Sequence, residues 1–249
     1  MKIGAQLYTV RSSTQTLEDF AETLKKVADI GYKTVQVSGT CPFPAEWLKA
    51  ELDKNGLECA VTHTPPARLL SETEAVCSEH KIFGCNYVGF GWNAFKLDEG
   101  DTPERFIESY LPVAQKIRDS GLRFMYHNHD QEFQKVGGRL IIDILADAFA
   151  DADAGFIVDT FWVQAGGADP AAWIRKLKGR APCIHLKDYA YGRKFAVVGE
   201  GNMNFDAIFK AAEDSGVKYM LVEQDDCYGE DPFECLKRSY QYLKSKGFE

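Results

Sequence analysis

Eight short β-rich segments alternate with eight amphipathic segments along this 249-residue chain. The β-rich segments lie near residues 2–8, 33–38, 57–63, 86–91, 122–127, 155–159, 182–186 and 218–223. The amphipathic segments lie near residues 15–30, 44–55, 71–83, 102–120, 139–149, 169–178, 204–215 and 231–246. Parallel strands need crossover helices, and both faces of a parallel sheet must be covered. The alternation therefore predicts an α/β protein, a single (β/α)8 TIM barrel over residues 1–249 with a parallel eight-stranded core.

The rival fold for such an alternation is an open doubly wound sheet. That fold commonly carries a G-x-G-x-x-G turn directly after its first strand, where the backbone approaches a dinucleotide. No such turn follows the first β-rich segment of this chain. The closed barrel is therefore the favoured fold.

The net charge and composition of the chain disfavour nucleic acid and membrane as partners. The chain has 29 Lys and Arg against 37 Asp and Glu, a net charge of −8, which disfavours nucleic acid as a partner. It has no signal-peptide pattern and no apolar run of membrane-spanning length. Its 7 cysteines include no C-x-x-C pair and fit a reducing compartment. We therefore expect a cytoplasmic protein that binds neither nucleic acid nor membrane.

Polar residues follow four of the later predicted strands. They occur in YHNHDQEF (126–133), IVDTF (157–161), CIHLKD (183–188) and MLVEQD (220–225). The C-terminal strand ends of a barrel meet at one face, so we expect Glu132, Asp159, His185 and Glu223 to converge there. Carboxylate oxygens and one imidazole nitrogen suit a single divalent metal ion, with Mn²⁺ as the first expectation and Co²⁺, Mg²⁺ or Zn²⁺ as alternatives.

Three further histidines lie at predicted strand ends. His127 and His129 flank Asn128, and alternate residues of a strand share a face, so both imidazoles are expected to point the same way. One of them is expected to bind the metal, act as an acid or base, or orient a ligand by a hydrogen bond. His63 either contacts the substrate or bonds a loop carbonyl.

The loops after strands six and seven carry candidate substrate contacts. Lys187 and Asp188 follow His185 directly, and Arg193 lies further along the same loop. A cation here would hold a substrate hydroxyl, carboxylate or phosphate, or polarise a carbonyl. Trp162 is one of several aromatic residues at the strand ends, and such rings pack against the C–H faces of sugars.

Taken together, these motifs resemble the xylose isomerase-like (β/α)8 superfamily, and within it the sugar phosphate isomerase/epimerase-type proteins. The resemblance covers the chain from IGAQLYTVR (3–11) to VEQD (222–225). It implies a metal quartet of Glu132, Asp159, His185 and Glu223. It also implies that Glu132 and Glu223 act as acid and base on opposite faces of a ketose. Members of this group are often dimers or tetramers, so a homo-oligomer is an open expectation.

The sequence departs from that pattern after the fifth strand. Epimerases of this type place a glutamate directly at the strand end, where this chain has His127, Asn128 and His129. His127 is therefore an alternative to Glu132 as the metal ligand. The YHNHxxEF form is similar to a subgroup that acts on 3-keto sugars and their glycosides, and in that interpretation His129 is the base and Glu132 is purely a metal ligand.

The primary functional hypothesis is a metal-dependent isomerase or epimerase that removes a proton next to the carbonyl of a ketose or keto sugar, phosphorylated or not. The alternative is a lyase or dehydratase acting on 3-keto sugars, 3-keto glycosides or an inosose. Less favoured alternatives are an apurinic endonuclease-like enzyme and a sugar-binding barrel without catalysis. The expected partner in the main hypotheses is a small sugar or keto sugar.

Overall fold

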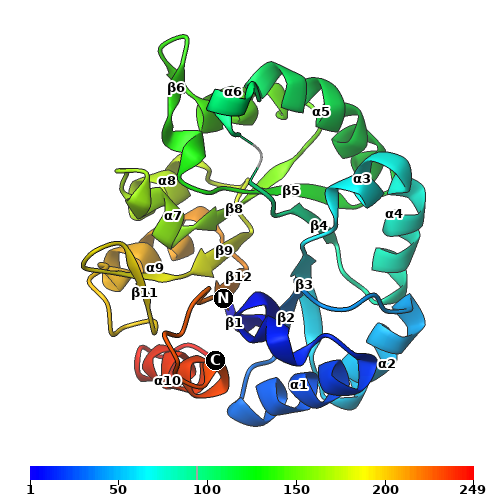
Figure 1. Ribbon diagram of the computed structural model, residues 1–249, viewed down its shortest axis with the longest axis vertical. Coiled ribbons are helices and arrows are strands. Elements are labelled where there is room, and N and C mark those ends of the chain that lie inside the picture. The colour runs from blue at the N-terminus through cyan, green and yellow to red at the C-terminus, as the bar shows by residue number, and fades with distance from the viewer. Residues whose placement is uncertain (94) are drawn as a thin grey trace.

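Eight parallel strands form the centre of the computed structural model, which describes residues 1–93 and 95–249. Their order in the sheet is β3-β2-β1-β12-β9-β8-β5-β4. The strands are β1 Lys2–Gln6, β2 Thr34–Val37, β3 Glu58–Thr62, β4 Tyr87–Phe90, β5 Arg123–His127, β8 Gly155–Asp159, β9 Cys183–Leu186 and β12 Tyr219–Val222. Figure 1 shows them at the middle of a ring of helices. The predicted (β/α)8 barrel is confirmed.

The helices of the outer ring follow the strands in alternation (Figure 1). They are α1 Leu17–Ile30, α2 Ala45–Lys54, α3 Pro66–Ser71, α4 Thr73–Ile82, α5 Pro103–Asp119, α6 Ile141–Ala148, α7 Thr160–Ala165, α8 Pro170–Lys176, α9 Phe205–Ser215 and α10 Pro232–Ser245. Several begin at residues whose side chains cap the free amides of the first turn. Thr102, for example, accepts a hydrogen bond from the Arg105 amide at the start of α5.

The two ends of the strand order, β3 and β4, lie against each other and nearly close the barrel. The Thr64 amide donates to the Gly89 carbonyl over 2.8 Å. A Cβ atom at position 89 would lie 2.1 Å from the Thr62 carbonyl oxygen. Only glycine therefore permits this close approach of the two strands.

The hydrophobic core has two layers. The larger lies between the sheet and the helices, and the smaller fills the barrel interior with Ala60, Val61, Met125, Ile157, Cys183 and Leu221. Since alternate residues of a strand share a face, the residues two places after Met125, Ile157, Cys183 and Leu221 also face inward. This interior layer supports the site above it.

The structure differs from the sequence prediction at several connections. The first strand ends at Gln6 rather than near residue 8, because the Gln6 side chain accepts a hydrogen bond from the Tyr8 amide and starts the 3₁₀ helix Leu7–Ser13. Helices α3 and α7 were not expected. Two small hairpins were also missed: β6 Lys135–Val136 with β7 Arg139–Leu140, and β10 Asp188–Ala190 with β11 Lys194–Ala196.

Within the described residues, every helix is too short or too polar to cross a membrane.

Candidate active site

The side chains of the candidate site stand on the inward face of the strands, directly above the interior apolar layer. His127 follows Met125 by two residues, and Asp159 follows Ile157 in the same way. His185 and Glu223 follow Cys183 and Leu221. The strand register also pairs Asp159 with His185. The period-two pattern of four strands therefore brings four side chains of types that can bind a metal to one level.

These four residues, His127, Asp159, His185 and Glu223, form a compact group. They are buried, and each offers one nitrogen or oxygen atom within 4.8 Å of the others. Nδ1 of His185 lies 2.8 Å from Oε2 of Glu223, and Nε2 of His127 lies 3.3 Å from Oδ2 of Asp159. Two imidazole nitrogens and two carboxylate oxygens form a donor set that fits a divalent cation.

Hydrogen bonds outside the group fix its orientation. Nε2 of His185 donates to Oε1 of Gln36 over 2.7 Å, which leaves Nδ1 of His185 to face Asp159 and Glu223. Oδ1 of Asp159 accepts from the Trp162 amide at the start of α7, so Oδ2 faces the histidines. Such partners fix the tautomer and rotamer of ligating side chains.

The buried Lys187 supplies positive charge beside the group. Its Nζ lies 2.7 Å from Oδ1 of Asp225, 3.3 Å from Oε2 of Glu223 and 3.5 Å from Oδ2 of Asp159. Burial opposes ionisation of Glu223, but Lys187 and His185 outweigh it and hold the pKa of Glu223 below its usual range. Burial also raises the pKa of Asp225 to about 6.

His185 carries a proton more readily than a free imidazole. Burial alone would lower its pKa, but the carboxylates of Glu223 and Asp159 outweigh burial and raise the pKa to about 9. A metal ligand must offer a free nitrogen lone pair, so a cation bound at Nδ1 has to displace this proton. The charge of the group is therefore linked to cation binding.

Glu132 lies outside the four-residue group. It belongs to the 3₁₀ turn Gln131–Phe133, beyond the end of β5. Its Oε1 accepts from the Tyr126 hydroxyl over 2.5 Å and its Oε2 accepts from the His129 amide over 2.8 Å. Burial raises its pKa to about 7. The structure thus places His127, and not Glu132, beside the other three expected ligands, because His127 has the inward position of the strand.

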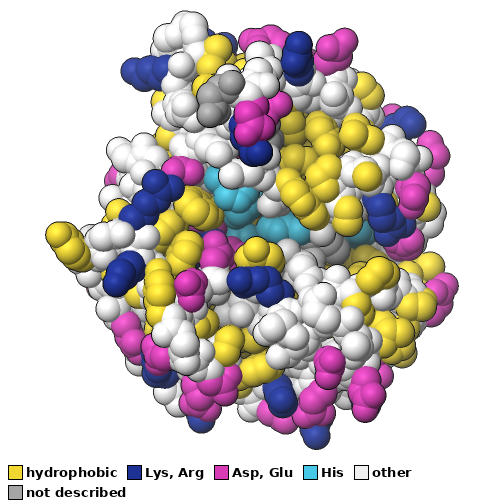
Figure 2. Space-filling model, viewed as in Figure 1, with side chains coloured by type: hydrophobic (Ala, Val, Ile, Leu, Met, Phe, Trp, Pro, Cys, Tyr) yellow, Lys and Arg dark blue, Asp and Glu magenta, His cyan; other side chains and the backbone are white. Residues whose placement is uncertain are grey.

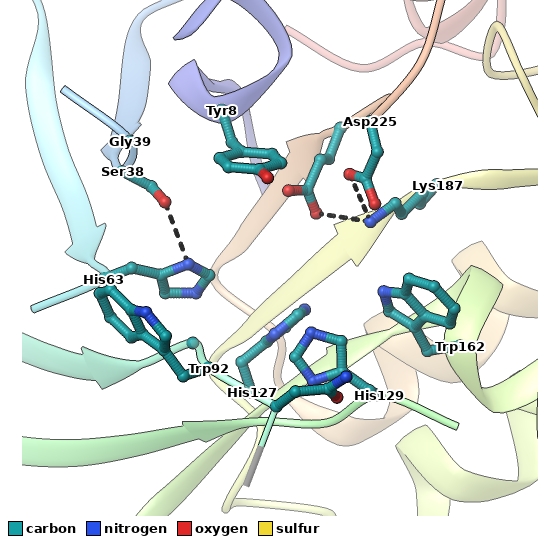
Figure 3. A pocket seen from close by; sticks show the side chains of 13 residues that line it. Tyr8, Ser38, Gly39, His63, Trp92, His127, His129, Trp162, Lys187 and Asp225 are labelled. Atoms are coloured by element: carbon teal, nitrogen blue, oxygen red, sulfur yellow. Dashed lines mark hydrogen bonds and ion pairs between the residues drawn. The ribbon is translucent and has the colours of Figure 1, made fainter. Parts of the chain in front are cut away.

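A cavity of about 250 Å³ opens above the group (Figure 3). Its walls include six residues expected to act in catalysis or to contact substrate: His63, His127, His129, Trp162, Lys187 and Glu223. Figure 3 shows Trp92 and Trp162 on opposite sides of the imidazoles, and in Figure 2 the histidines lie in a hollow of the surface. Nε2 of His63, Nδ1 of His127 and Nδ1 of His129 have no hydrogen-bond partner in the described structure. These nitrogens are buried and unpaired, so the site has hydrogen-bonding capacity that the described residues do not use.

Asp188 and Arg193, which were expected to contact the substrate, do not line this cavity. The Asp188 carboxylate accepts hydrogen bonds from the amides of Tyr189, Gly199, Gly201 and Met203, and so organises the loop after β9. Arg193 pairs with Asp130 and does not line the 250 Å³ cavity. The Asp188 bonds form within its own loop, and the Arg193 pair joins two loops; sequence spacing reveals neither contact.

Two residues of the site were not singled out in the sequence. Gln36 is the hydrogen-bond partner of His185, and Asp225 is an ion-pair partner of Lys187. The period of two along a strand offers a signal for Asp225, because it follows Glu223 by two residues. Gln36 lacks such a signal, since a polar residue inside a four-residue strand is also common on a solvated face.

Comparison with known proteins places these features in context. A family model described as xylose isomerase-like TIM barrel matches residues 24–246. The inosose dehydratase of Clostridium perfringens (strain 13 / Type A) is 23% identical, over 91% of this chain and 90% of that protein. A sugar phosphate isomerase/epimerase from Parabacteroides distasonis ATCC 8503 superposes with a TM-score of 0.82 at 22% identity, covering 98% of this chain and 93% of that one. The IolI protein with a binding zinc atom gives a TM-score of 0.72 at 14% identity, with both chains fully covered.

Proposed function

This chain belongs to the xylose isomerase-like TIM barrel family, and from that premise we propose that it is a metal-dependent lyase that dehydrates a keto sugar or keto-cyclitol. The main observation behind the proposal is the position of Glu132. Two-glutamate epimerisation needs carboxylates on both faces of the ketose, but Glu132 is held by Tyr126 and His129 outside the cavity. The similarity to inosose dehydratases, at 23% identity for one of them, supports the same reaction class.

We assign the metal to His127, Asp159, His185 and Glu223. When bound, the metal would polarise the substrate carbonyl and make the adjacent C–H acidic. The group has two imidazole nitrogens, one more than the sequence prediction contained. This change favours Zn²⁺ alongside Mn²⁺, because imidazole suits zinc well. The zinc atom in the related IolI fold fits this assignment.

His129 is the proposed base. Its imidazole lines the cavity, and Nδ1 has no partner in the described structure. Burial, together with the neighbouring His127, lowers the pKa of His129 well below its ordinary value, so the imidazole is neutral near pH 7 and can accept a proton. In the proposed reaction it takes the proton from the carbon next to the ketone. The imidazolium then returns that proton to the hydroxyl leaving from the β carbon, and the products are an unsaturated ketone and water.

Lys187 and Trp162 hold the substrate during this transfer. Nζ of Lys187 lies 5.1 Å from the centre of the Trp162 ring, and the ring of His129 lies 5.5 Å from it. A sugar face packed on Trp162 would therefore lie close to both the base and the ammonium group. We assign to Lys187 a hydrogen bond to a substrate hydroxyl.

The test is a proton NMR experiment in D₂O with the metal-loaded protein and an inosose or a 3-keto sugar. We expect loss of water and a new unsaturated or diketone product. Epimerisation begins with the same proton abstraction but conserves mass, so deuterium incorporation without elimination would replace the lyase by an epimerase. If neither exchange nor elimination occurs with these compounds, the proposed chemistry is wrong.

A further inference from the structure

His129 lies on irregular backbone, between the end of β5 and the 3₁₀ turn Gln131–Phe133. Its imidazole nevertheless has a defined place. The ring centre lies 4.7 Å from that of His127 and 5.5 Å from that of Trp162, and Figure 3 shows the ring between these two side chains. Irregular backbone holds a side chain less precisely than a helix or strand does, so other contacts must fix this ring.

The backbone of His129 is held by side chains. Its amide donates to Oε2 of Glu132 over 2.8 Å, and its carbonyl accepts from Nδ2 of Asn128 over 3.3 Å. Within residues 1–93 and 95–249, neither group forms a hydrogen bond with another backbone group. The bond to Glu132 is the shorter of the two, and its acceptor is a carboxyl oxygen, so it is also the stronger.

The carboxyl group of Glu132 is itself fixed to the barrel. Glu132 is fully buried, and its Oε1 accepts from the Tyr126 hydroxyl over 2.5 Å. Tyr126 belongs to β5, and its ring stacks on that of Phe90 in β4 with the centres 5.8 Å apart. One carboxyl group therefore connects a rigid strand to the amide of His129. A glutamate that reaches back three residues to a free amide also occurs at helix starts, in the capping box.

Two neighbouring side chains hold other parts of the same segment. Oδ1 of Asn128 accepts from the Asp159 amide at the end of β8 over 3.0 Å, and Asp130 pairs with Arg193. Neither of these contacts involves the amide of the proposed base. Loss of the Glu132 carboxyl group would therefore release the turn at the base itself, while the rest of the segment stays attached.

We propose that Glu132 is the positioning residue of His129: its carboxyl group binds the His129 amide and so holds the imidazole beside Trp162. In this role Glu132 neither binds the metal nor transfers the proton. The role explains why a carboxyl group is buried outside both the four-residue group and the 250 Å³ cavity. The identity of His129 as the base rests on the proposed function, whereas the positioning of its ring does not.

Nuclear magnetic resonance of the zinc-loaded protein tests the positioning without a substrate. The chain has 5 histidines, so ¹⁵N-histidine labelling gives few signals. In the wild-type protein the His129 amide is expected to exchange slowly with solvent. Its imidazole protons are expected to show nuclear Overhauser contacts with the Trp162 ring. A rapidly exchanging amide, or the absence of these contacts, would overturn the proposal without any variant.

Two substitutions of Glu132 separate positioning from support of the fold. Glu132→Met keeps a straight side chain without a carboxyl oxygen, and it is expected to speed exchange of the His129 amide about 10- to 100-fold. It is also expected to weaken the contacts with Trp162. Glu132→Gln keeps an oxygen acceptor and should retain both signals. Glu132→Ala replaces the methionine variant if that protein does not fold.

Tyr126→Phe is the matched control, because it removes the other partner of the buried carboxyl group and leaves the His129 amide bond in place. It should retain slow exchange and the contacts with Trp162. Unchanged His129 signals in folded Glu132→Met would show that Glu132 only supports the fold. An equal change in Tyr126→Phe would indicate a general packing effect. Either result overturns the proposal.

Turnover of an inosose or a 3-keto sugar separates this inference from the proposed function. Glu132→Met is expected to lower kcat about 10- to 100-fold with KM and metal content unchanged, because a displaced base reacts slowly. Glu132→Gln should restore most of kcat. Loss of metal in Glu132→Met would make Glu132 a ligand and overturn the proposal. Full kcat with a displaced imidazole would contradict His129 as the base and leave the positioning intact. If the wild-type protein turns over neither compound, the proposed function fails and the resonance measurements alone decide the positioning.

Discussion

Nε2 of His185 donates a hydrogen bond to Oε1 of Gln36 over 2.7 Å, although the two residues are 149 positions apart in the chain. Both side chains are fully buried. The bond directs the other imidazole nitrogen toward Asp159 and Glu223. Gln36 therefore has a role in orienting the proposed metal ligand without contacting the metal.

Gln36→Leu is expected to weaken metal affinity about 10- to 100-fold, which is typical when the hydrogen-bond partner of a ligating histidine is lost. Competition with a chromophoric chelator measures this affinity. Gln6→Leu is a matched control, because Gln6 is equally buried in the neighbouring strand β1 but bonds the Tyr8 amide. An equal loss of affinity in both variants would indicate a general packing effect.

His127→Ala is expected to remove stoichiometric metal binding, whereas Glu132→Gln is expected to retain it. The reason is that His127 lies within the four-residue group, while Glu132 bonds Tyr126 and the His129 amide. Metal content after dialysis, measured by mass spectrometry, distinguishes the two. Loss of metal in Glu132→Gln with retention in a folded His127→Ala protein would restore the glutamate as the ligand.

Metal affinity is expected to rise with pH, by about one logarithmic unit per pH unit below pH 9 and with little further gain above it. The carboxylates of Glu223 and Asp159 overcome the effect of burial and raise the pKa of His185 to about 9, so binding at neutral pH releases its proton. Calorimetry in buffers of different ionisation enthalpy counts the released proton. A pH-independent affinity between pH 7 and 9 would contradict this linkage.

The raised pKa of His185 also makes the stability of the metal-free protein depend on pH. The folded-state pKa of His185 is raised from 6.5 to about 9, so its contribution to stability is complete below pH 6.5 and is lost as pH rises through 9. Thermal unfolding in the presence of a chelator should show this decline. The metal-loaded protein should not show it, because its His185 is already deprotonated.

Gly91→Ala is expected to reduce activity while the barrel stays folded. A Cβ atom at position 91 would lie 2.2 Å from Nδ1 of His63, so the ring must move out of the wall of the 250 Å³ cavity. Circular dichroism reports the fold, and kcat/KM reports the site. Gly84→Ala is a contrasting variant at a glycine with open space around it, where strain of the backbone is the expected effect. Full activity in Gly91→Ala would show that the position of His63 is unimportant.

The sequence by itself determined the barrel and three of the four grouped side chains. Strand and helix periodicities are local properties, so eight alternations were sufficient to predict eight parallel strands. Asp159 and His185 lie within their strands and Glu223 directly follows β12, where the period of two and the strand end specify an inward position. Their convergence then follows from the geometry of any closed parallel barrel.

The tertiary structure decided the positions of the side chains in the loops that follow the strands. The turn after β5 places Glu132 beside Tyr126, whereas His127 lies with Asp159, His185 and Glu223. Asp188 binds amides up to 15 residues away, and Arg193 pairs with Asp130 from another loop. These contacts depend on how each loop folds and on how the loops pack together, which no short-range period records. The sequence therefore predicted that the site lies at the C-terminal strand ends, while loop packing decided which side chains lie in it.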